Sequence, residues 1–268
     1  MTSTVRSGIS VSREAGALGA IVTGVDLAQA VDGATFDAVR GAFADNLVIC
    51  IRGQAHVRPE DQLKFATRWG EISVHPYVPS IDGYPGVMRV SDPTPVTTTW
   101  HADTTHLAAP PALTLLLARQ VPPYGGDTMF ANQYLAYEGL SPGLRATVDT
   151  LRAVHKGTEL AKEAGLDREA LTASHPVVRT HPETARRCLF VNGNYTTHIE
   201  GWTAEESRPF LEYLYAQACR PEYTWRHHWQ IGDLVIWDNR CTQHAVIGDV
   251  AGGERVLHRV TIAGDVPV

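Results

Sequence analysis

Short apolar runs recur along the chain, and each is bounded by Gly, Pro, Asp or Asn. Runs of this length that are rich in aliphatic residues are typical of strands covered on both faces. They lie at 47–51, 113–117, 189–191 and 234–237. The pattern therefore predicts a mainly β protein in which these four segments are core strands.

Apolar residues spaced three or four positions apart predict a few helices between the strands. This spacing occurs at 36–43 and at 63–69, where Gly70 is a typical helix end. Ser141 followed by Pro142 predicts an N-cap and a first helical residue. We expect these helices to be peripheral and to pack outside the sheets.

A further helix is predicted after Thr203, because Thr203 and Glu206 have the spacing of a capping box. Pro209 follows the first turn and is predicted to bend this helix or to delay its start. Many short strands with peripheral helices favour a double-sheet jelly roll over a doubly wound parallel sheet. Since no linker or repeat interrupts the pattern, residues 1–268 are predicted to form a single domain.

The C-terminal segment ERVLHRVTI alternates in a way that places two arginines on one face of a strand. Residues two apart share a face in extended backbone. One face then carries Arg255, Leu257, Arg259 and Thr261. If this face looks into a barrel, each guanidinium needs an anionic partner, because an unpaired buried charge is costly. A dicarboxylate ligand would supply that partner, whereas the competing interpretation is a solvent-exposed face.

The segment TTTWHADTTH offers two metal-binding side chains, His101 and Asp103, which share one face in extended backbone. His244 in WDNRCTQHAV follows a predicted core strand, where a turn can return its imidazole to that pair. Two histidines and one carboxylate leave open positions on the ion and are the ligand set of non-haem Fe(II) oxygenases. These three residues are the candidate metal ligands.

Each of these residues is a weak signal by itself, because short motifs recur by chance in a chain with 12 histidines. His181 with Glu183, and His198 with Glu200, have the same spacing and are interpreted as solvated loop residues. A single histidine beside an apolar strand is more often a hydrogen-bonded core or surface residue than a ligand.

Composition points to a small-molecule partner. The formal net charge is −6 with a pI near 6.0, and the basic residues are scattered, so no nucleic-acid partner is expected. The apolar run at 112–118 is far shorter than the roughly 20 residues that span a bilayer. The first ten residues lack the apolar core of a signal peptide, and no C-x-x-C pair occurs. We therefore expect a reduced, cytoplasmic protein without a membrane segment.

Eight segments spread over the chain form a recognisable set. They are GALGAIVTGVDL, WGEISVHP, WHAD, PPYGGDTMFAN, HPVVRTHP, LFVN, GDLVIWDNRCTQH and RVLHRVTIAGD. Together they resemble the taurine dioxygenase (TauD/TfdA) family of Fe(II)- and 2-oxoglutarate-dependent enzymes over nearly the full chain. The resemblance implies a double-stranded β-helix of the jelly-roll type that uses Fe(II), 2-oxoglutarate and O2.

Aligned residue by residue, the resemblance makes His101, Asp103 and His244 the iron ligands on which catalysis depends. It assigns Thr128 and Arg255 to the distal carboxylate of 2-oxoglutarate. The implied reaction hydroxylates an anionic small molecule and decarboxylates 2-oxoglutarate to succinate and CO2.

The resemblance also implies a substrate subsite. Arg259 aligns with an arginine near the other end of the co-substrate and near the anionic head of the substrate, and His75 aligns with a histidine that contacts the substrate sulfonate. Thr104 directly follows the metal aspartate and is expected to shape the substrate wall.

Several positions that contact taurine in the family's namesake differ here. Val78 stands where a tyrosine is found, Thr97 replaces an asparagine, and Tyr195 and Gly157 replace phenylalanines. Loss of polar contacts and of side-chain volume is predicted to weaken taurine binding and to enlarge the pocket.

The expected activity is oxidation of a taurine-like sulfonate to an aldehyde and sulfite, with an alkyl sulfatase of the same family as the alternative. A non-catalytic or zinc-bound jelly-roll module is the hypothesis from another class, because His/His/Asp also binds Zn(II). Family members are often dimers or tetramers, so a homo-oligomer is expected.

Overall fold

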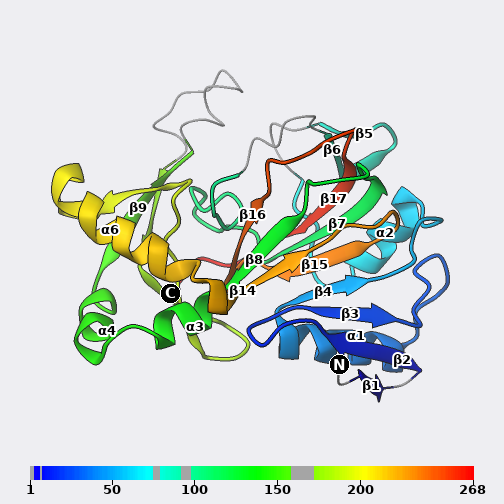
Figure 1. Ribbon diagram of the computed structural model, residues 1–268, viewed down its shortest axis with the longest axis horizontal. Helices are drawn as coiled ribbons and strands as arrows, with labels where there is room; N and C mark the ends of the chain where they lie inside the picture. The colour runs from blue at the N-terminus through cyan, green and yellow to red at the C-terminus, as the bar shows by residue number, and fades with distance from the viewer. Residues whose placement is uncertain (1–2, 7, 75–78, 92–97, 158–171) are drawn as a thin grey trace.

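The computed structural model of the chain describes residues 3–6, 8–74, 79–91, 98–157 and 172–268. In these residues the longest sheet has nine strands in the order β1-β2-β3-β4-β15-β7-β17-β6-β5 (Figure 1). The bounds are β1 (Ser3–Arg6), β2 (Ile9–Arg13), β3 (Ala20–Thr23), β4 (Val48–Ile51), β5 (Ser80–Ile81), β6 (Tyr84–Ser91), β7 (Leu113–Gln120), β15 (Leu234–Asp238) and β17 (Val256–Ile262).

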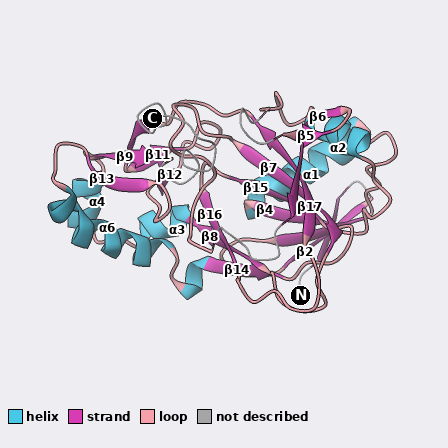
Figure 2. Cartoon of the chain, turned by 90° about the horizontal axis from the view of Figure 1, so that it is seen from above, coloured by secondary structure: helices cyan, strands magenta, loops and turns pink. Residues whose placement is uncertain are grey.

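A smaller sheet with the order β14-β8-β16 packs against the inner face of the large one (Figures 1 and 2). Its strands are β8 (Thr128–Asn132), β14 (Thr224–His227) and β16 (Thr242–Val246). On the outer face of the large sheet lie α1 (Gly33–Asn46) and α2 (Pro59–Ala66). The result is the two-layer jelly roll with peripheral helices that the strand pattern and the resemblance predicted.

Within the apolar runs, alternate residues face opposite sides of the large sheet. In β7, Leu113, Leu115 and Leu117 pack toward the helices, whereas Leu116 and Ala118 pack toward the small sheet. The same alternation holds in β4 and β15, so an uninterrupted apolar run still has two distinct faces. The residues that face the small sheet are the ones that can line a site between the layers.

A third group of elements packs beside the two sheets, at the left of Figure 1. Its own apolar cluster joins helices to short strands. The elements are α3 (Gln133–Glu138), α4 (Pro142–Val148), β9 (Arg152–Lys156), β10 (Thr172–Pro176), β11 (Val178–Thr180), β12 (Arg187–Leu189), β13 (Thr196–Ile199), α6 (Ala204–Ala218) and the 3-10 helix η2 (Pro221–Tyr223). Within the described ranges, no helix is both long enough and apolar enough to cross a membrane.

The predicted helix starts are confirmed. Ser141 caps α4 by accepting a hydrogen bond from Leu144 N, and Thr203 with Glu206 forms the capping box of α6. Pro209 lies inside α6 and does not delay its start, because the capping box already holds the first turn at Ala204. The predicted strand at 189–191 is displaced, since β12 ends at Leu189.

Candidate active site

A cavity of about 220 Å³ lies between the two sheets. The large sheet contributes Leu116, Trp237 and Arg259 to its wall, and the small sheet contributes Thr128 and His244. Every one of these positions lies on a strand face that the alternation turns toward the space between the layers. The rigid strands therefore hold the polar groups of the cavity in place.

The three candidate metal ligands meet in the wall of this cavity. Asp103 Oδ1 lies 4.0 Å from His101 Nε2 and 3.8 Å from His244 Nε2. These separations are too long for hydrogen bonds and suit three atoms that share one ion. The structure thus brings together residues up to 143 positions apart in the sequence, and their side chains are almost fully buried.

Main-chain hydrogen bonds fix the two histidines relative to each other. His101 N donates to His244 O at 3.0 Å, and His244 N donates to His101 O at 2.8 Å. His101 Nδ1 lies 2.8 Å from Thr99 O, which requires Nδ1 to carry the proton and leaves the lone pair on Nε2. The donor set and its tautomer fit a divalent iron ion.

Burial sets the charge state of this group. Burial lowers the pKa of His101, and burial together with the neighbouring His101 lowers the pKa of His244 to about 3. Burial alone would raise the pKa of Asp103, but Arg259 and the two histidines hold it below its usual value. At neutral pH the site therefore offers two neutral imidazoles and one carboxylate, as a divalent cation requires.

A second polar group forms at one end of the cavity. Arg255 Nη2 donates to Thr128 Oγ1 at 3.2 Å, and Trp229 Nε1 donates to the same hydroxyl oxygen at 3.0 Å. The guanidinium lies 5.2 Å from the centroid of the Trp229 ring, and burial lowers the pKa of Arg255 to about 10. Because Arg255 Nε has no partner among the described residues, this buried cation still has donors to offer an anion.

Two glycines before Thr128 allow this group to form. Gly125 has φ +76°, and a Cβ there would lie within 2.7 Å of Asp249. A Cβ on Gly126, at φ +73°, would lie 3.2 Å from the Arg255 side chain. The GGDT motif is thus needed so that the backbone can approach Arg255 closely.

Arg259 contacts the candidate metal ligand Asp103 and does not lie at the end of the cavity with Arg255. Its Nη2 lies 2.8 Å from Asp103 Oδ2, and its Nε donates to Thr261 Oγ1 at 3.3 Å. Arg255 and Arg259 both line the cavity, as the alternation of the C-terminal strand predicted. The competing interpretation, a solvent-exposed strand face, is wrong.

The remaining predicted substrate residues divide into two sets. Thr104 and Tyr195 line the cavity, and burial raises the pKa of Tyr195 to about 12. His75, Val78 and Thr97 lie outside the described residues, so their places stay predictions.

Gly157 does not add the expected room. A Cβ on Gly157 would lie 2.7 Å from the His106 ring, so that ring takes the space of the missing side chain. The His106 ring packs 5.1 Å from Tyr195, which lines the cavity. The prediction of a pocket enlarged at this position is therefore wrong.

Reasoning from the sequence missed several residues of the site. Trp237 lines the cavity with its ring centroid 4.8 Å from that of His244, and Thr114 donates to Asp103 Oδ2 at 2.7 Å. The signal for Thr114 was a hydroxyl within an otherwise apolar run, which has a cost unless the hydroxyl is bonded.

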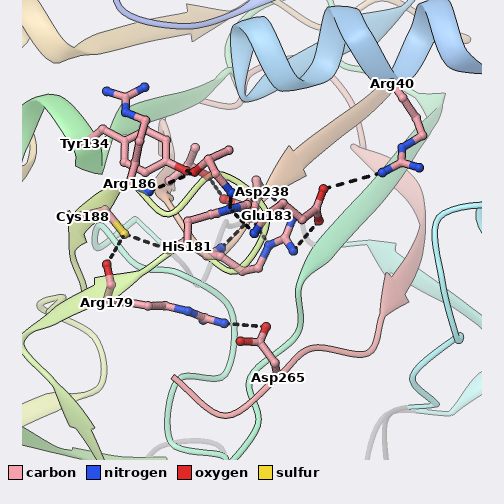
Figure 3. A network of polar contacts seen from close by, with 12 residues as sticks. Arg40, Tyr134, Arg179, His181, Glu183, Arg186, Cys188, Asp238 and Asp265 are labelled. Carbon is pink, nitrogen blue, oxygen red and sulfur yellow. Dashed lines mark hydrogen bonds and ion pairs between the residues drawn. The ribbon is translucent and has the colours of Figure 1, made fainter. Parts of the chain in front are cut away.

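A second buried polar network lies between α1 and the turn from β15 to β16 (Figure 3). His181 Nε2 lies 3.1 Å from Asp238 Oδ2, and His181 is only 3% exposed, so its interpretation as a solvated residue is wrong. Arg240 contacts both oxygens of Asp238, at 2.9 Å through Nε and 2.7 Å through Nη2. Although Cys241 lies close enough for a metal-binding set, the Asp238 oxygens are already occupied by a cation.

This network predicts a stability effect. Arg240→Met would leave Asp238 buried without its cation and should cost about 3–5 kcal/mol. The matched variant Arg40→Gln removes an exposed contact, 3.6 Å from Glu183, and should cost less than about 1 kcal/mol. Urea unfolding measures both changes in the free energy of unfolding. Equal losses in the two variants would contradict the role of Arg240 as the cation that neutralises buried Asp238.

The lowered pKa of Asp238 determines how the stabilisation by its contact with Arg240 depends on pH. Although burial raises the pKa of Asp238, Arg240 and His181 lower it to about 2. The stabilisation is then present above the ordinary carboxyl pKa and is lost as pH falls toward 2.

Comparisons with known proteins agree with this geometry. Residues 10–261 match the model of the taurine catabolism dioxygenase TauD, TfdA family. An alpha-ketoglutarate-dependent sulfate ester dioxygenase of Pseudomonas putida is 35% identical over 97% of this chain and 91% of its own length. An alkylsulfatase of Acinetobacter baylyi is 34% identical over 94% of this chain and 84% of its own.

A solved structure extends the similarity to the whole fold. The crystal structure of a taurine dioxygenase from Burkholderia xenovorans superposes with a TM-score of 0.88 at 38% identity, covering 97% of this chain and 91% of that chain. Alpha-ketoglutarate is 2-oxoglutarate, the co-substrate expected from the motifs. The chain therefore belongs to the TauD/TfdA family and is a dioxygenase that depends on Fe(II), 2-oxoglutarate and O2.

Proposed function

We propose that this dioxygenase oxidises alkyl sulfate esters at the carbon that bears the sulfate group. The observation that carries the proposal is the make-up of the cavity wall. Met88, Val90, Leu116 and Val246 provide apolar surface. Among the described lining residues the one carboxylate is Asp103, which is already bound to Arg259 and Thr114.

The balance of charges favours a monoanion without an ammonium group. The described lining residues carry the cations of Arg255 and Arg259 and the anion of Asp103. Adding Fe(II) and doubly charged 2-oxoglutarate leaves one positive charge, which a sulfate ester neutralises. Taurine would bring an ammonium group for which the described part of the wall has no carboxylate to spare.

The protein's part in the reaction is to bind, orient and exclude water. We propose His101, Asp103 and His244 as the metal ligands, with Thr128 and Arg255 binding the distal carboxylate of 2-oxoglutarate. Bound Fe(II) couples decarboxylation of 2-oxoglutarate with insertion of one oxygen atom of O2 into a substrate C–H bond. Trp237 and Tyr195 cover the cavity wall beside the metal group and keep water away from it.

Hydroxylation next to the sulfate oxygen makes the product unstable. The hydroxyl group loses its proton, a C=O bond forms, and the C–O bond to the sulfate group breaks. An alkyl sulfate, 2-oxoglutarate and O2 thus give an aldehyde, hydrogensulfate, succinate and CO2. The names of two relatives support a sulfate ester over a sulfonate as the substrate, because one is a sulfate ester dioxygenase and the other an alkylsulfatase.

A panel with matched chains tests the substrate. Hexyl sulfate, hexane-1-sulfonate and taurine are compared by succinate formation with iron-loaded enzyme. We expect kcat/KM for hexyl sulfate to exceed that for taurine by at least about 100-fold, since an unpaired ammonium group costs several kcal/mol on desolvation. Hexane-1-sulfonate should fall between them, because it keeps the anionic head. A preference for taurine would overturn the proposal.

A further inference from the structure

A relay of hydrogen bonds joins the turn after β15 to the carboxylate of Asp103. Thr114 Oγ1 lies 2.7 Å from Asp103 Oδ2, and Asn239 Nδ2 lies 3.0 Å from Thr114 Oγ1. Asn239 Oδ1 is 3.2 Å from Asp103 N and 3.0 Å from Trp237 Nε1. All four residues are at least 95% buried, so each polar atom depends on its partner in the protein.

The donor and acceptor in every link of this relay follow from chemistry. Trp237 Nε1 and the main-chain nitrogen of Asp103 can only donate, so the atom of Asn239 that they approach is its oxygen. The amide nitrogen of Asn239 must then donate to Thr114 Oγ1. Because that hydroxyl already accepts a hydrogen bond, its own hydrogen is directed to Asp103 Oδ2.

The relay gives the two oxygens of Asp103 different surroundings. Oδ2 accepts from Thr114 and pairs with Arg259, at 2.7 and 2.8 Å. Oδ1 faces His101 Nε2 and His244 Nε2 beyond hydrogen-bond distance. One oxygen is therefore held away from the metal position, and the other is presented to it.

We propose that Thr114 and Asn239 are positioning residues that make Asp103 bind iron through Oδ1 alone. A single-oxygen contact leaves more of the coordination sphere open for 2-oxoglutarate and O2. Packing alone does not call for this threonine, since valine has nearly the same shape and would avoid burying a hydroxyl in β7. Neither residue lines the cavity, so both would act through Asp103.

The test measures metal binding, with no substrate present. Mn(II) affinity is determined by calorimetry for the wild type, Thr114→Val, Thr114→Ser and Asn239→Asp. We expect Thr114→Val to weaken Mn(II) binding by about 10- to 100-fold, the usual effect of losing a residue that orients a ligand. Thr114→Ser keeps the hydroxyl and should stay within about threefold of the wild type.

Asn239→Asp tests the direction of the relay. The introduced carboxylate still accepts from Trp237 and Asp103 N, but its second oxygen cannot donate to Thr114. The hydroxyl hydrogen is then drawn away from Asp103, so we expect a loss of Mn(II) affinity similar to that of Thr114→Val.

A matched control separates positioning from general loss of stability. Thr242 is 1% exposed and donates to Asp238 O at 2.6 Å and not to Asp103. Thr242→Val should lower the unfolding midpoint as Thr114→Val does, but should bind Mn(II) within about threefold of the wild type. Wild-type Mn(II) affinity in folded Thr114→Val, or equal losses in Thr114→Val and Thr114→Ser, would overturn the proposal. Neither outcome depends on which substrate the enzyme oxidises.

Discussion

Asp103→Asn is expected to lower kcat/KM by at least about a thousand-fold, because it removes the negative charge that pairs with Arg259 and that the proposed metal site requires. Asparagine has almost the same shape, so packing around the side chain should be retained. The variant leaves the partly buried Arg259 beside a neutral amide and removes the anionic member of the proposed ligand set. Iron content after anaerobic loading and succinate formation measure the two consequences.

A surface aspartate provides the control for this change. Asp149 pairs with Arg187 at 2.7 Å outside the cavity, and Asp149→Asn should leave iron content and succinate formation near the wild-type values. Full iron loading by Asp103→Asn with wild-type turnover would show that the metal is held elsewhere.

Arg255→Leu should raise the KM for 2-oxoglutarate by about 30- to 1000-fold, corresponding to about 2–4 kcal/mol for a truncated buried charge pair. Arg255 lies at the end of the cavity, where its guanidinium packs over the Trp229 ring and its Nη2 donates to Thr128 Oγ1. A carboxylate of the co-substrate that reaches this end would pair with the Arg255 cation. Arg255→Lys should recover part of the loss, since lysine keeps the charge and loses the paired geometry. Initial rates at varied 2-oxoglutarate give the values.

A second arginine separates this effect from a general change of charge. Arg220 pairs with Glu222 on the surface, and Arg220→Gln should leave the KM for 2-oxoglutarate unchanged. An unchanged KM in Arg255→Leu would place the co-substrate in another part of the cavity.

Much of the fold could be predicted because local signals and tertiary packing agree. The capping residues Ser141 and Thr203 start helices where the sequence predicts them, since their side chains replace missing backbone partners. The apolar runs locate the core strands of the large sheet, but not their order. That order depends on which strands pair across the chain, as β4 and β7 do with β15, and no local pattern carries this information.

The proximity of His101, Asp103 and His244 could be predicted from spacing and resemblance, whereas the residues that hydrogen-bond to Asp103 could not. His101 and Asp103 share a face, and the structure brings His244 to them through a main-chain bridge. The partners of Asp103 come from other strands, so a hydroxyl such as Thr114 has no neighbour in sequence that reveals its role.

Two interpretations failed for the same physical reason. His181 with Glu183 was interpreted as a solvated loop pair, but Asp238 and Tyr134 cover His181 from other elements. Gly157 suggested extra room, but His106, from the segment that carries His101 and Asp103, fills that space. Side-chain neighbours brought in by the tertiary fold decided both cases.

Oxygen-dependent release of sulfate from hexyl sulfate would show directly whether the protein is an alkyl sulfate dioxygenase. Iron-loaded enzyme is incubated with 2-oxoglutarate in air and under nitrogen, and inorganic sulfate and succinate are quantified together. We expect equal amounts of sulfate and succinate in air and neither product under nitrogen. Sulfate released without O2, or succinate formed in air without sulfate, would show that the enzyme does not oxidise alkyl sulfates.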